Sequence, residues 1–212
     1  EVTGPSDFAA TPANPTCGTS NGSIIVTGVT DGSGTYTYSK DGTTFQPSNT
    51  FSGLAPGSHT ITVKDSNGCT IAKSFTLTNV PGPTAVTASS TPASCLNNDG
   101  TVTAGEVTGG TGTKTYSING TTFQAGTTFT GLASGNYTLT AKDANGCIVT
   151  TTVTVAQASI TNFTATPASS TCGNPNGTVT ISGVTGGVGS LEYSKDGQNY
   201  QSSFTLTGFA AG

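Results

Sequence analysis

The sequence predicts an all-β protein made of tandem immunoglobulin-like antiparallel β-sandwich repeats that together form a rod. Three observations support this prediction: a composition rich in Thr, Ser, Gly and Asn, a pattern that recurs about every 78 residues, and turn dipeptides between short apolar clusters. No segment shows apolar residues at helical spacing with a cap at each end. Short strands joined by tight turns fit this composition, whereas helices do not.

The recurring pattern is clearest at the cysteines. Cys17 returns as Cys95 and Cys172, 78 and 77 residues further along, and Cys69 returns as Cys147 after another 78 residues. Self-similarity at a fixed period is the signature of a repeat protein. We therefore expect two complete β-sandwich repeats and an incomplete third, over residues 1–80, 81–158 and 159–212.

The third repeat lacks the C-terminal strands and the second cysteine of the other two. Its turn segment ends at Gly212, where the first two copies continue into strand-like sequence after Gly57 and Gly135. Two explanations stay open: its own longer chain completes the repeat, or a neighbouring chain supplies the strands by exchange. We favour the first explanation, because Glu1 aligns with Asn79 and leaves no spare strand before the first repeat.

Apolar and polar residues alternate within each repeat with the two-residue period of a half-buried strand. Ile24 and Val26 share one face of a strand, and so do Ile61 and Val63. The aligned positions stay apolar in the other copies, as Val102, Ala104, Leu139, Ala141, Val179 and Ile181. This pattern predicts roughly six or seven strands in each complete repeat.

Asn-Gly and Asp-Gly dipeptides separate the strand-like runs and predict two-residue hairpin turns. The predicted turn residues are Asp41, Gly42, Asn67, Gly68, Asn119, Gly120, Asn145, Gly146, Asp196 and Gly197. Short linkers at 80–83 and 156–158 separate the repeats. Proline in the first linker limits bending, which fits a stiff rod.

The cysteines are expected to stabilise sandwiches that are too small to be stable unaided. Equal spacing favours pairing within each repeat, Cys17 with Cys69 and Cys95 with Cys147, and each bond would contribute ~4 kcal/mol. The partner of Cys172 would then lie beyond the chain end. Pairing between repeats, free thiols and a metal site are the alternatives, although the sequence has no CxxC pair or histidine cluster for zinc. Disulfides would place the protein outside the cytoplasm.

Composition excludes several classes of function. The chain has no arginine, six lysines and ten acidic residues, for a net charge of −4. It therefore has no basic patch for nucleic acid, and no apolar run approaches the ~20 residues that cross a bilayer. We expect no enzyme activity, no cofactor and no metal.

Several polar residues are candidates for functional sites, but their sequence context indicates structural roles. His59 is the only histidine and aligns with Tyr137, so it is expected to be a structural residue on a strand and no member of a triad. Lys64-Asp65 and Lys142-Asp143 recur, but an Asp before a turn usually binds turn amides. Oxygen ligands at Asp65 and Asn67 are too few for calcium, which stays an open minor alternative. The tyrosines Tyr36, Tyr38, Tyr116 and Tyr193 are expected to pack in the core, with a sugar-stacking platform as the alternative.

Four sequence features together resemble one known family over the whole chain. The first cysteine is followed by Asn21-Gly22, Asp99-Gly100 or Asn176-Gly177, and a Tyr-x-Tyr-Ser strand leads into Asp41-Gly42. A Phe-x-Gly-Leu-Ala-x-Gly turn and a Val-Lys-Asp-x-Asn-Gly-Cys ending at 63–69 follow. This combination resembles the SprB repeats of very large surface proteins of gliding Bacteroidota. Lys114 and Leu191 depart from it, where the first Tyr of the strand would stand.

The resemblance implies a cell-surface adhesin that is associated with the outer membrane and exported by the type IX secretion system. The implied partners are a surface polysaccharide or substratum and the outer-membrane secretion and gliding machinery. We expect the chain to be a structural spacer of such an adhesin. The alternatives are a carbohydrate-binding module array of an exported protein and a surface filament subunit that exchanges strands.

Overall fold

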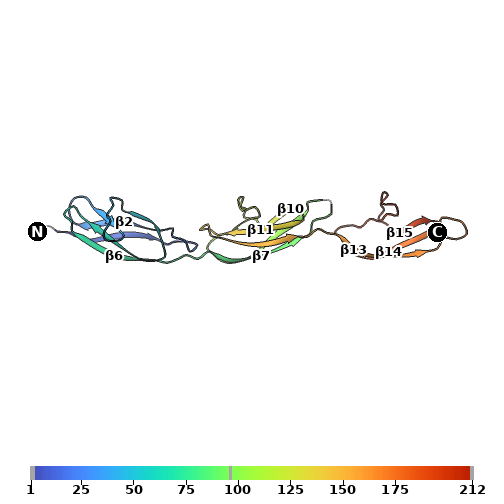
Figure 1. Cartoon of the computed structure of the whole chain (residues 1–212), viewed down its shortest axis with the longest axis horizontal. Helices are drawn as coiled ribbons and strands as arrows, with labels where there is room; N and C mark the ends of the chain where they lie inside the picture. Colours follow the sequence, from blue (N-terminus) through green and yellow to red (C-terminus); the bar gives the residue numbers. More distant parts are fainter. Residues whose placement is uncertain (1–2, 96, 211–212) are drawn as a thin grey trace. The chain divides into compact units, whose positions relative to one another are not determined.

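The computed structural model describes residues 3–95 and 97–210, and all regular elements in them are β-strands (Figure 1). The all-β prediction is therefore confirmed for the described part of the chain. The residues form two compact units: the first comprises 1–87, 106–125 and 140–151, and the second 88–105, 126–139 and 152–212. The first repeat lies in the first unit, the third repeat lies in the second unit, and the second repeat contributes to both.

Two three-stranded antiparallel sheets make up the first repeat. One contains β1 (Pro5–Ala13), β2 (Gly22–Asp31) and β4 (Thr50–Leu54) in the order β1-β2-β4. The other contains β3 (Thr37–Ser39), β5 (Gly57–Lys64) and β6 (Thr70–Leu77) in the order β3-β5-β6. Six strands in two sheets around one core is the expected sandwich.

The core of the first repeat lies between these two sheets. One buried cluster contains side chains from both sheets that are at most 2% exposed: Phe8, Ile24 and Val26 from one sheet, and Ile61 and Val63 from the other. They occupy alternating positions along their strands, as the sequence predicts. Burying a side chain of this size stabilises the fold by about 1.5–3 kcal/mol.

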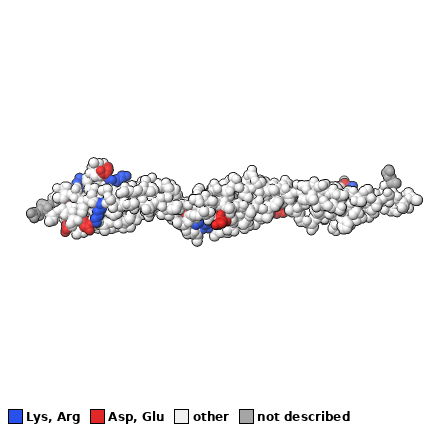
Figure 2. Space-filling view, turned by 90° about the horizontal axis from the view of Figure 1, so that it is seen from below, with Lys and Arg blue, Asp and Glu red and all other residues white. Residues whose placement is uncertain are grey.

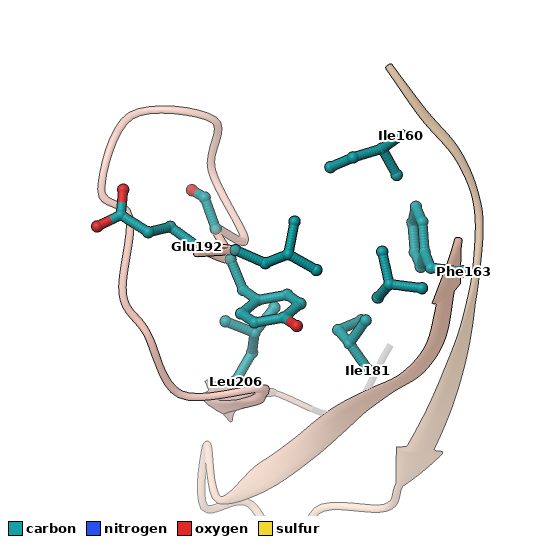
Figure 3. Close-up of a pocket in the computed structure, with 9 residues that line it drawn as sticks. Ile160, Phe163, Ile181, Glu192 and Leu206 are labelled. Carbon is teal, nitrogen blue, oxygen red and sulfur yellow. The ribbon is translucent and has the colours of Figure 1, made fainter. Parts of the chain in front are cut away.

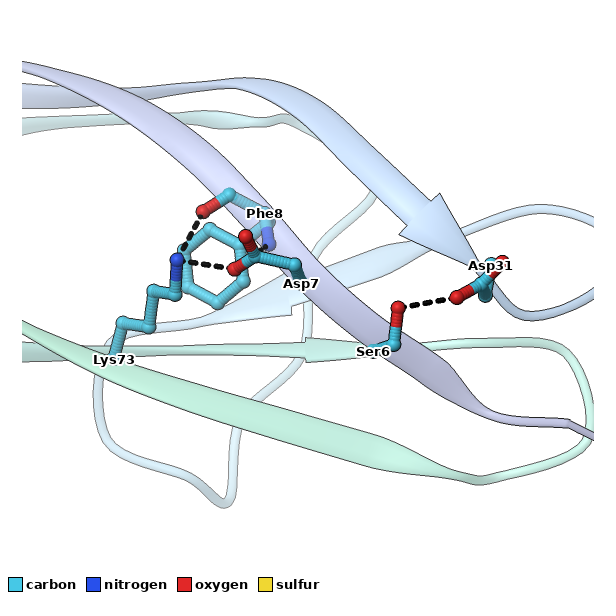
Figure 4. A network of polar contacts seen from close by, with 5 residues as sticks. All are labelled: Ser6, Asp7, Phe8, Asp31 and Lys73. Atoms are coloured by element: carbon cyan, nitrogen blue, oxygen red, sulfur yellow. Dashed lines mark hydrogen bonds and ion pairs between the residues drawn. The ribbon is translucent and has the colours of Figure 1, made fainter.

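A polar network joins β1 and β6 of the first repeat at the edge of this core (Figure 4). The Lys73 ammonium donates a hydrogen bond to the Phe8 carbonyl oxygen at 2.8 Å and forms an ion pair with Asp7. The hydrogen bond from Lys73 and one from the Phe8 amide lower the pKa of the Asp7 carboxyl. Because both charged side chains are exposed, the ion pair contributes little stability.

The second repeat repeats this arrangement of strands. One sheet contains β7 (Pro83–Thr91), β8 (Gly100–Gly109) and β10 (Thr128–Leu132) in the order β10-β8-β7. The other contains β9 (Thr115–Ser117), β11 (Gly135–Lys142) and β12 (Ile148–Val155) in the order β12-β11-β9. The apolar positions aligned with the first core are again buried, at Val86, Val102, Ala104, Leu139 and Ala141.

The third repeat has one sheet in the described residues. It contains β13 (Ile160–Ala168), β14 (Gly177–Gly186) and β15 (Thr205–Phe209) in the order β13-β14-β15. An isolated bridge pairs Tyr193 with Gln201. Residues 211–212, the end of its predicted turn segment, lie outside the described residues.

The turns differ from the two-residue hairpins that their dipeptides predict. Lys64 and Thr70 are the last paired residues of β5 and β6, so residues 65–69 form the turn that contains Asn67-Gly68. The two-residue turn predicted for Asn-Gly needs a positive φ at both central residues. Here Gly68 has a φ of +87°, and Asn67 is not among the residues with positive φ. The prediction of turn length was therefore wrong.

The Asp41-Gly42 segment shows what the acidic residue does instead. Tyr38 and Gln46 pair across a loop at residues 39–45. Asp41 Oδ1 accepts hydrogen bonds from the amides of Thr44 and Thr43 at 2.7 and 2.8 Å. These bonds lower the pKa of Asp41 and close the loop as an Asx-type turn.

Candidate functional site: the disulfide at the end of the first repeat

Each repeat carries its first cysteine in a tight loop after its first strand. We call Cys17, Cys95 and Cys172 the first cysteines, and Cys69 and Cys147 the second cysteines. The Thr16 amide donates a hydrogen bond to Asn21 Oδ1 at 2.7 Å. The aligned pairs are Ser94 with Asp99 at 2.6 Å and Thr171 with Asn176 at 2.8 Å. The Cys17 amide donates to the Val80 carbonyl at 3.1 Å, so this cysteine lies beside the last residue of the first repeat.

Each second cysteine lies in the turn between the last two strands of its repeat, where a buried aspartate organises the backbone. Asp143 Oδ1 accepts hydrogen bonds from the amides of Asn145 at 3.0 Å and Cys147 at 2.9 Å, and Oδ2 accepts one from the Thr111 amide at 2.9 Å. Burial opposes the charged form, but these bonds outweigh it and lower the pKa of Asp143. In the first repeat Asp65 accepts the same bonds from Asn67, Cys69 and Ser33.

A glycine in the linker lets Cys147 approach the backbone closely. A Cβ at Gly82 would lie 2.5 Å from the Cys147 Cβ, closer than real side chains come. The Cys147 side chain is 3% exposed and forms a disulfide with Cys17, with the two Cα atoms 5.3 Å apart. This separation is usual for a disulfide. The bond joins the end of the first repeat to the start of the second.

The predicted pairings of Cys17 with Cys69 and of Cys95 with Cys147 are therefore wrong. Cys69 immediately precedes β6, whereas Cys17 lies beside Val80, which follows β6. An eight-residue strand spans roughly 26 Å. Two cysteines at opposite ends of such a strand cannot form a bond, since a disulfide needs Cα atoms within about 7 Å.

The other three cysteines are free thiols in positions that match the bonded pair. A Cβ at Gly4 would lie 2.7 Å from the Cys69 Cβ, so Cys69 packs against the start of its repeat as Cys147 does. The Cys95 thiol is exposed and donates a hydrogen bond to the Ala158 carbonyl at 2.8 Å. Cys172 is exposed.

His59 has the structural role that its alignment with Tyr137 predicts. His59 Nε2 lies 2.8 Å from the Ala55 carbonyl oxygen, and the Tyr137 hydroxyl donates to the Ala133 carbonyl at 3.0 Å. Both side chains are half-buried and bond to the carbonyl four residues earlier. Each holds the turn that precedes its own strand.

The recurring Lys-Asp pairs are not arranged for acid–base chemistry. The Lys64 ammonium lies 3.8 Å from the centre of the Phe45 ring, and Lys142 lies 3.7 Å from the centre of the Phe123 ring. The neighbouring aspartates bind turn amides. The pair therefore serves two separate structural contacts, a cation–π contact and a turn.

The aspartate turns direct their carboxylate oxygens at backbone amides. In both complete repeats Oδ1 of the aspartate accepts two backbone N–H groups. Among the described residues, no three His, Cys, Asp or Glu side chains are grouped to hold a metal ion.

Three of the four tyrosines that could form a sugar platform pack in or beside a core. Tyr116 is 9% exposed, and Tyr36 and Tyr38 pack against the first core cluster. The Tyr36 hydroxyl donates to the Asp31 carbonyl at 2.8 Å. Tyr193 lines a pocket in the third repeat.

The surface is sparsely charged. On the face shown in Figure 2, lysines and acidic residues form a few small patches separated by uncharged surface. None of the described residues forms a helix that could cross a bilayer.

No protein-family model and no curated protein matches the chain. Among solved structures it is similar to murine CEACAM1b, with 14% identity and a TM-score of 0.32 over 74% of this chain and 100% of that chain. The structure of a mouse coronavirus receptor-binding domain complexed with its murine receptor gives 10% identity and a TM-score of 0.34, over 70% of this chain and 98% of that chain. The surface layer protein SbsC, domains 1–6, has 16% identity and a TM-score of 0.29, over 98% of this chain and 41% of that chain. Identities and TM-scores this low assign no function to the chain. Its disulfide indicates an oxidising compartment outside the cytoplasm.

Proposed function

We propose that this chain is a non-enzymatic structural segment of a large secreted surface protein, in which the repeats act as a covalently reinforced spacer. The Cys17–Cys147 disulfide is the observation that carries the proposal, because it joins two successive repeats across their linker. A bond within one repeat would stabilise that repeat alone. A bond between repeats also resists their separation when the chain is pulled.

The residues that could have carried chemistry support the same proposal. His59, the Lys-Asp pairs and the aspartates of the turns are all engaged in bonds that hold turns or strands. Their counterparts in the second repeat make the same bonds. A set of contacts that recurs in this way is expected for a structural unit.

At the finer level, we propose that the parent protein is a cell-surface adhesin related to those of gliding Bacteroidota. The resemblance of the cysteine, turn and Tyr-x-Tyr-Ser patterns to SprB repeats supports this assignment. It would bring export by the type IX secretion system, association with the outer membrane, and a polysaccharide or other substratum as partner. An antibody raised against this chain should label intact source cells; labelling only after lysis would contradict surface display.

Single-molecule stretching tests the mechanical role. The disulfide removes 130 residues from the extensible length. At 3.3–3.6 Å per residue, reductant should therefore lengthen the fully stretched chain by ~430–470 Å. A Cys17→Ser variant should show the longer extension without reductant, and Cys172→Ser should behave as the parent chain.

Equal extensions with and without reductant would contradict the reinforced spacer. A glycan array on the same chain provides the second arm. Tight binding to one sugar class would replace the spacer by a carbohydrate-binding function, since a spacer needs no ligand of its own.

A further inference from the structure

The third repeat presents an apolar face that is covered in the first repeat. Phe163 aligns with Phe8, and the two side chains are 54% and 2% exposed. Ile160 is 55% exposed, whereas the aligned Pro5 is buried. Figure 3 shows Ile160 and Phe163 beside a pocket of about 200 Å³. Its lining also includes Ile181, Leu191, Tyr193, Leu206 and the charged Glu192.

The first repeat shows what covers such a face. The β5–β6 hairpin places Ile61, Val63 and Leu77 in one buried cluster with Phe8, and these three side chains are at most 1% exposed. The hairpin connects its strands through the turn that carries the second cysteine. A covering hairpin of this kind therefore brings a cysteine with it.

The backbone of the third repeat also has a position for such a hairpin. In the second repeat Tyr116 pairs with Ala141, and Ser117 with Thr140, so β9 is an edge to which β11 adds. Tyr193 aligns with Tyr116, and no sheet of the described third repeat includes it. Strand addition to a free edge supplies backbone hydrogen bonds, while pockets for alternate side chains supply specificity.

Cys95 lies next to this open face. A second pocket in the same compact unit is lined by Cys95, Ala158, Ile160, Val188 and Leu191. It shares Ile160, Leu191 and Glu192 with the first pocket, so the two pockets adjoin each other. Val188 aligns with Thr111, whose amide donates to the aspartate of the cysteine turn in the second repeat.

We propose that the open face of the third repeat and Cys95 form one docking site for a β-hairpin whose turn reads Asp-x-Asn-Gly-Cys, and that this cysteine forms a disulfide with Cys95. The bond would repeat, at the next junction, the one between Cys17 and Cys147. Cys69 packs against Gly4 as Cys147 packs against Gly82. By this geometry, Cys69 would form the corresponding disulfide with the first cysteine of a preceding repeat. Each junction between repeats then carries one covalent bond.

A second folded copy of this chain is a poor donor of the hairpin. Its own hairpins bury Ile61 and Leu139, both 0% exposed, so releasing either hairpin would open a core. The occupant is therefore a hairpin of this type that is not already part of a complete repeat.

The bond requires an oxidant. Two thiols lose two protons and two electrons when they form a disulfide, and glutathione disulfide takes these up to become two glutathione thiols. The reaction proceeds by thiol–disulfide exchange through a mixed disulfide.

The test mixes the 212-residue chain with a synthetic peptide of its own residues 135–155 in a glutathione redox buffer. Trypsin releases the three free cysteines on separate peptides, 65–73, 74–114 and 143–195, and the added peptide contributes a shorter 143–155 fragment. The expected result is linkage of 143–155 to 74–114, roughly 100-fold above linkage to the other two. This is the ratio of a millimolar effective concentration in the docked complex to a peptide at tens of micromolar.

Two controls keep the test decisive. A peptide with Leu139→Asp keeps the cysteine but loses the apolar face, so the preference for Cys95 should disappear. The preference should also disappear in 8 M urea, because urea unfolds the docking site and the three thiols then react with the peptide about equally. A peptide with Cys147→Ser should still slow amide exchange at residues 192–194. Equal labelling of the three cysteines by the native peptide, or a disulfide-linked dimer of the chain in place of the adduct, would overturn the proposal. Neither result bears on the stretching test of the spacer.

Discussion

The first and third repeats share a sequence pattern but differ in what covers it. Their first sheets have the same strand order, and Leu206 in the third repeat is 7% exposed where the aligned Phe51 is 5% exposed. The inner faces differ, because Phe163 is exposed and Phe8 is not. The comparison teaches that the first sheet provides only half of a core. The hairpin that carries the second cysteine provides the other half.

Loss of the disulfide has the largest expected effect on this comparison. Cys17→Ser removes a bond that closes 130 residues, and we expect it to destabilise the complete repeats by about 5 kcal/mol on the chain-entropy account. Cys172→Ser is the matched control in the third repeat and should change the free energy of unfolding by less than ~0.5 kcal/mol. Urea denaturation of both variants gives the two values. Equal losses would mean that the disulfide does not distinguish the repeats.

Truncation of the aligned phenylalanines probes the core itself. Phe8→Ala should cost about 3–5 kcal/mol, because a buried aromatic side chain leaves a cavity. Phe163→Ala should stay within about 0.5 kcal/mol, because this side chain is already exposed to solvent. Thermal and urea denaturation compare the two. A large loss at Phe163 would show that the third repeat has a core of its own.

The aspartate of the second-cysteine turn is expected to matter next. Asp143→Asn should destabilise the second repeat by about 1–3 kcal/mol, because buried donors lose a charged acceptor. Glu106→Gln, on an exposed position of β8, is the control.

The same variant has a pH dependence with a definite sign. The pKa of Asp143 is lower in the folded state than its ordinary value of 3.8. Its contribution to stability is therefore complete above pH 3.8 and is lost as the pH falls through the folded value. The difference between the parent chain and Asp143→Asn should be full at pH 7 and shrink below pH 3.8. A constant difference would refute the role of the charged carboxylate.

The smallest effect is expected at the only histidine. His59→Phe removes a hydrogen bond to the Ala55 carbonyl and should cost about 0.5–1.5 kcal/mol. His59→Tyr should recover most of this loss, since Tyr137 makes the same bond in the second repeat. Failure of Tyr to rescue would mean that the two positions are not equivalent.

Sequence reasoning predicted the strands well because burial follows a two-residue period. Ile24, Val26, Ile61 and Val63 all lie in the first core as their alternation predicts. Turn lengths were not predictable from the dipeptides. The Asp41 carboxylate accepts hydrogen bonds from the Thr43 and Thr44 amides, and these bonds close a loop longer than a two-residue turn.

The pairing of the cysteines was missed for a geometric reason. The cysteines recur at a constant period, which is compatible with bonds within each repeat and with bonds between neighbouring repeats. The period therefore cannot distinguish the two pairings. Strand direction can distinguish them, because Cys17 follows β1 while Cys69 precedes β6, and these cysteines lie at opposite ends of the sandwich. Tracing the direction of each successive antiparallel strand would have shown at which end of the sandwich each cysteine lies.

Mapping the disulfide in the non-reduced chain tests the central claim most directly. Trypsin cleavage at the six lysines places Cys17 on 1–40, Cys69 on 65–73 and Cys95 on 74–114, with Cys147 and Cys172 together on 143–195. In a Cys172→Ser chain, the account predicts one linked pair, 1–40 with 143–195, and free thiols on 65–73 and 74–114. Linkage of 1–40 to 65–73 and of 74–114 to 143–195 would contradict it, and would return both bonds to the interior of single repeats.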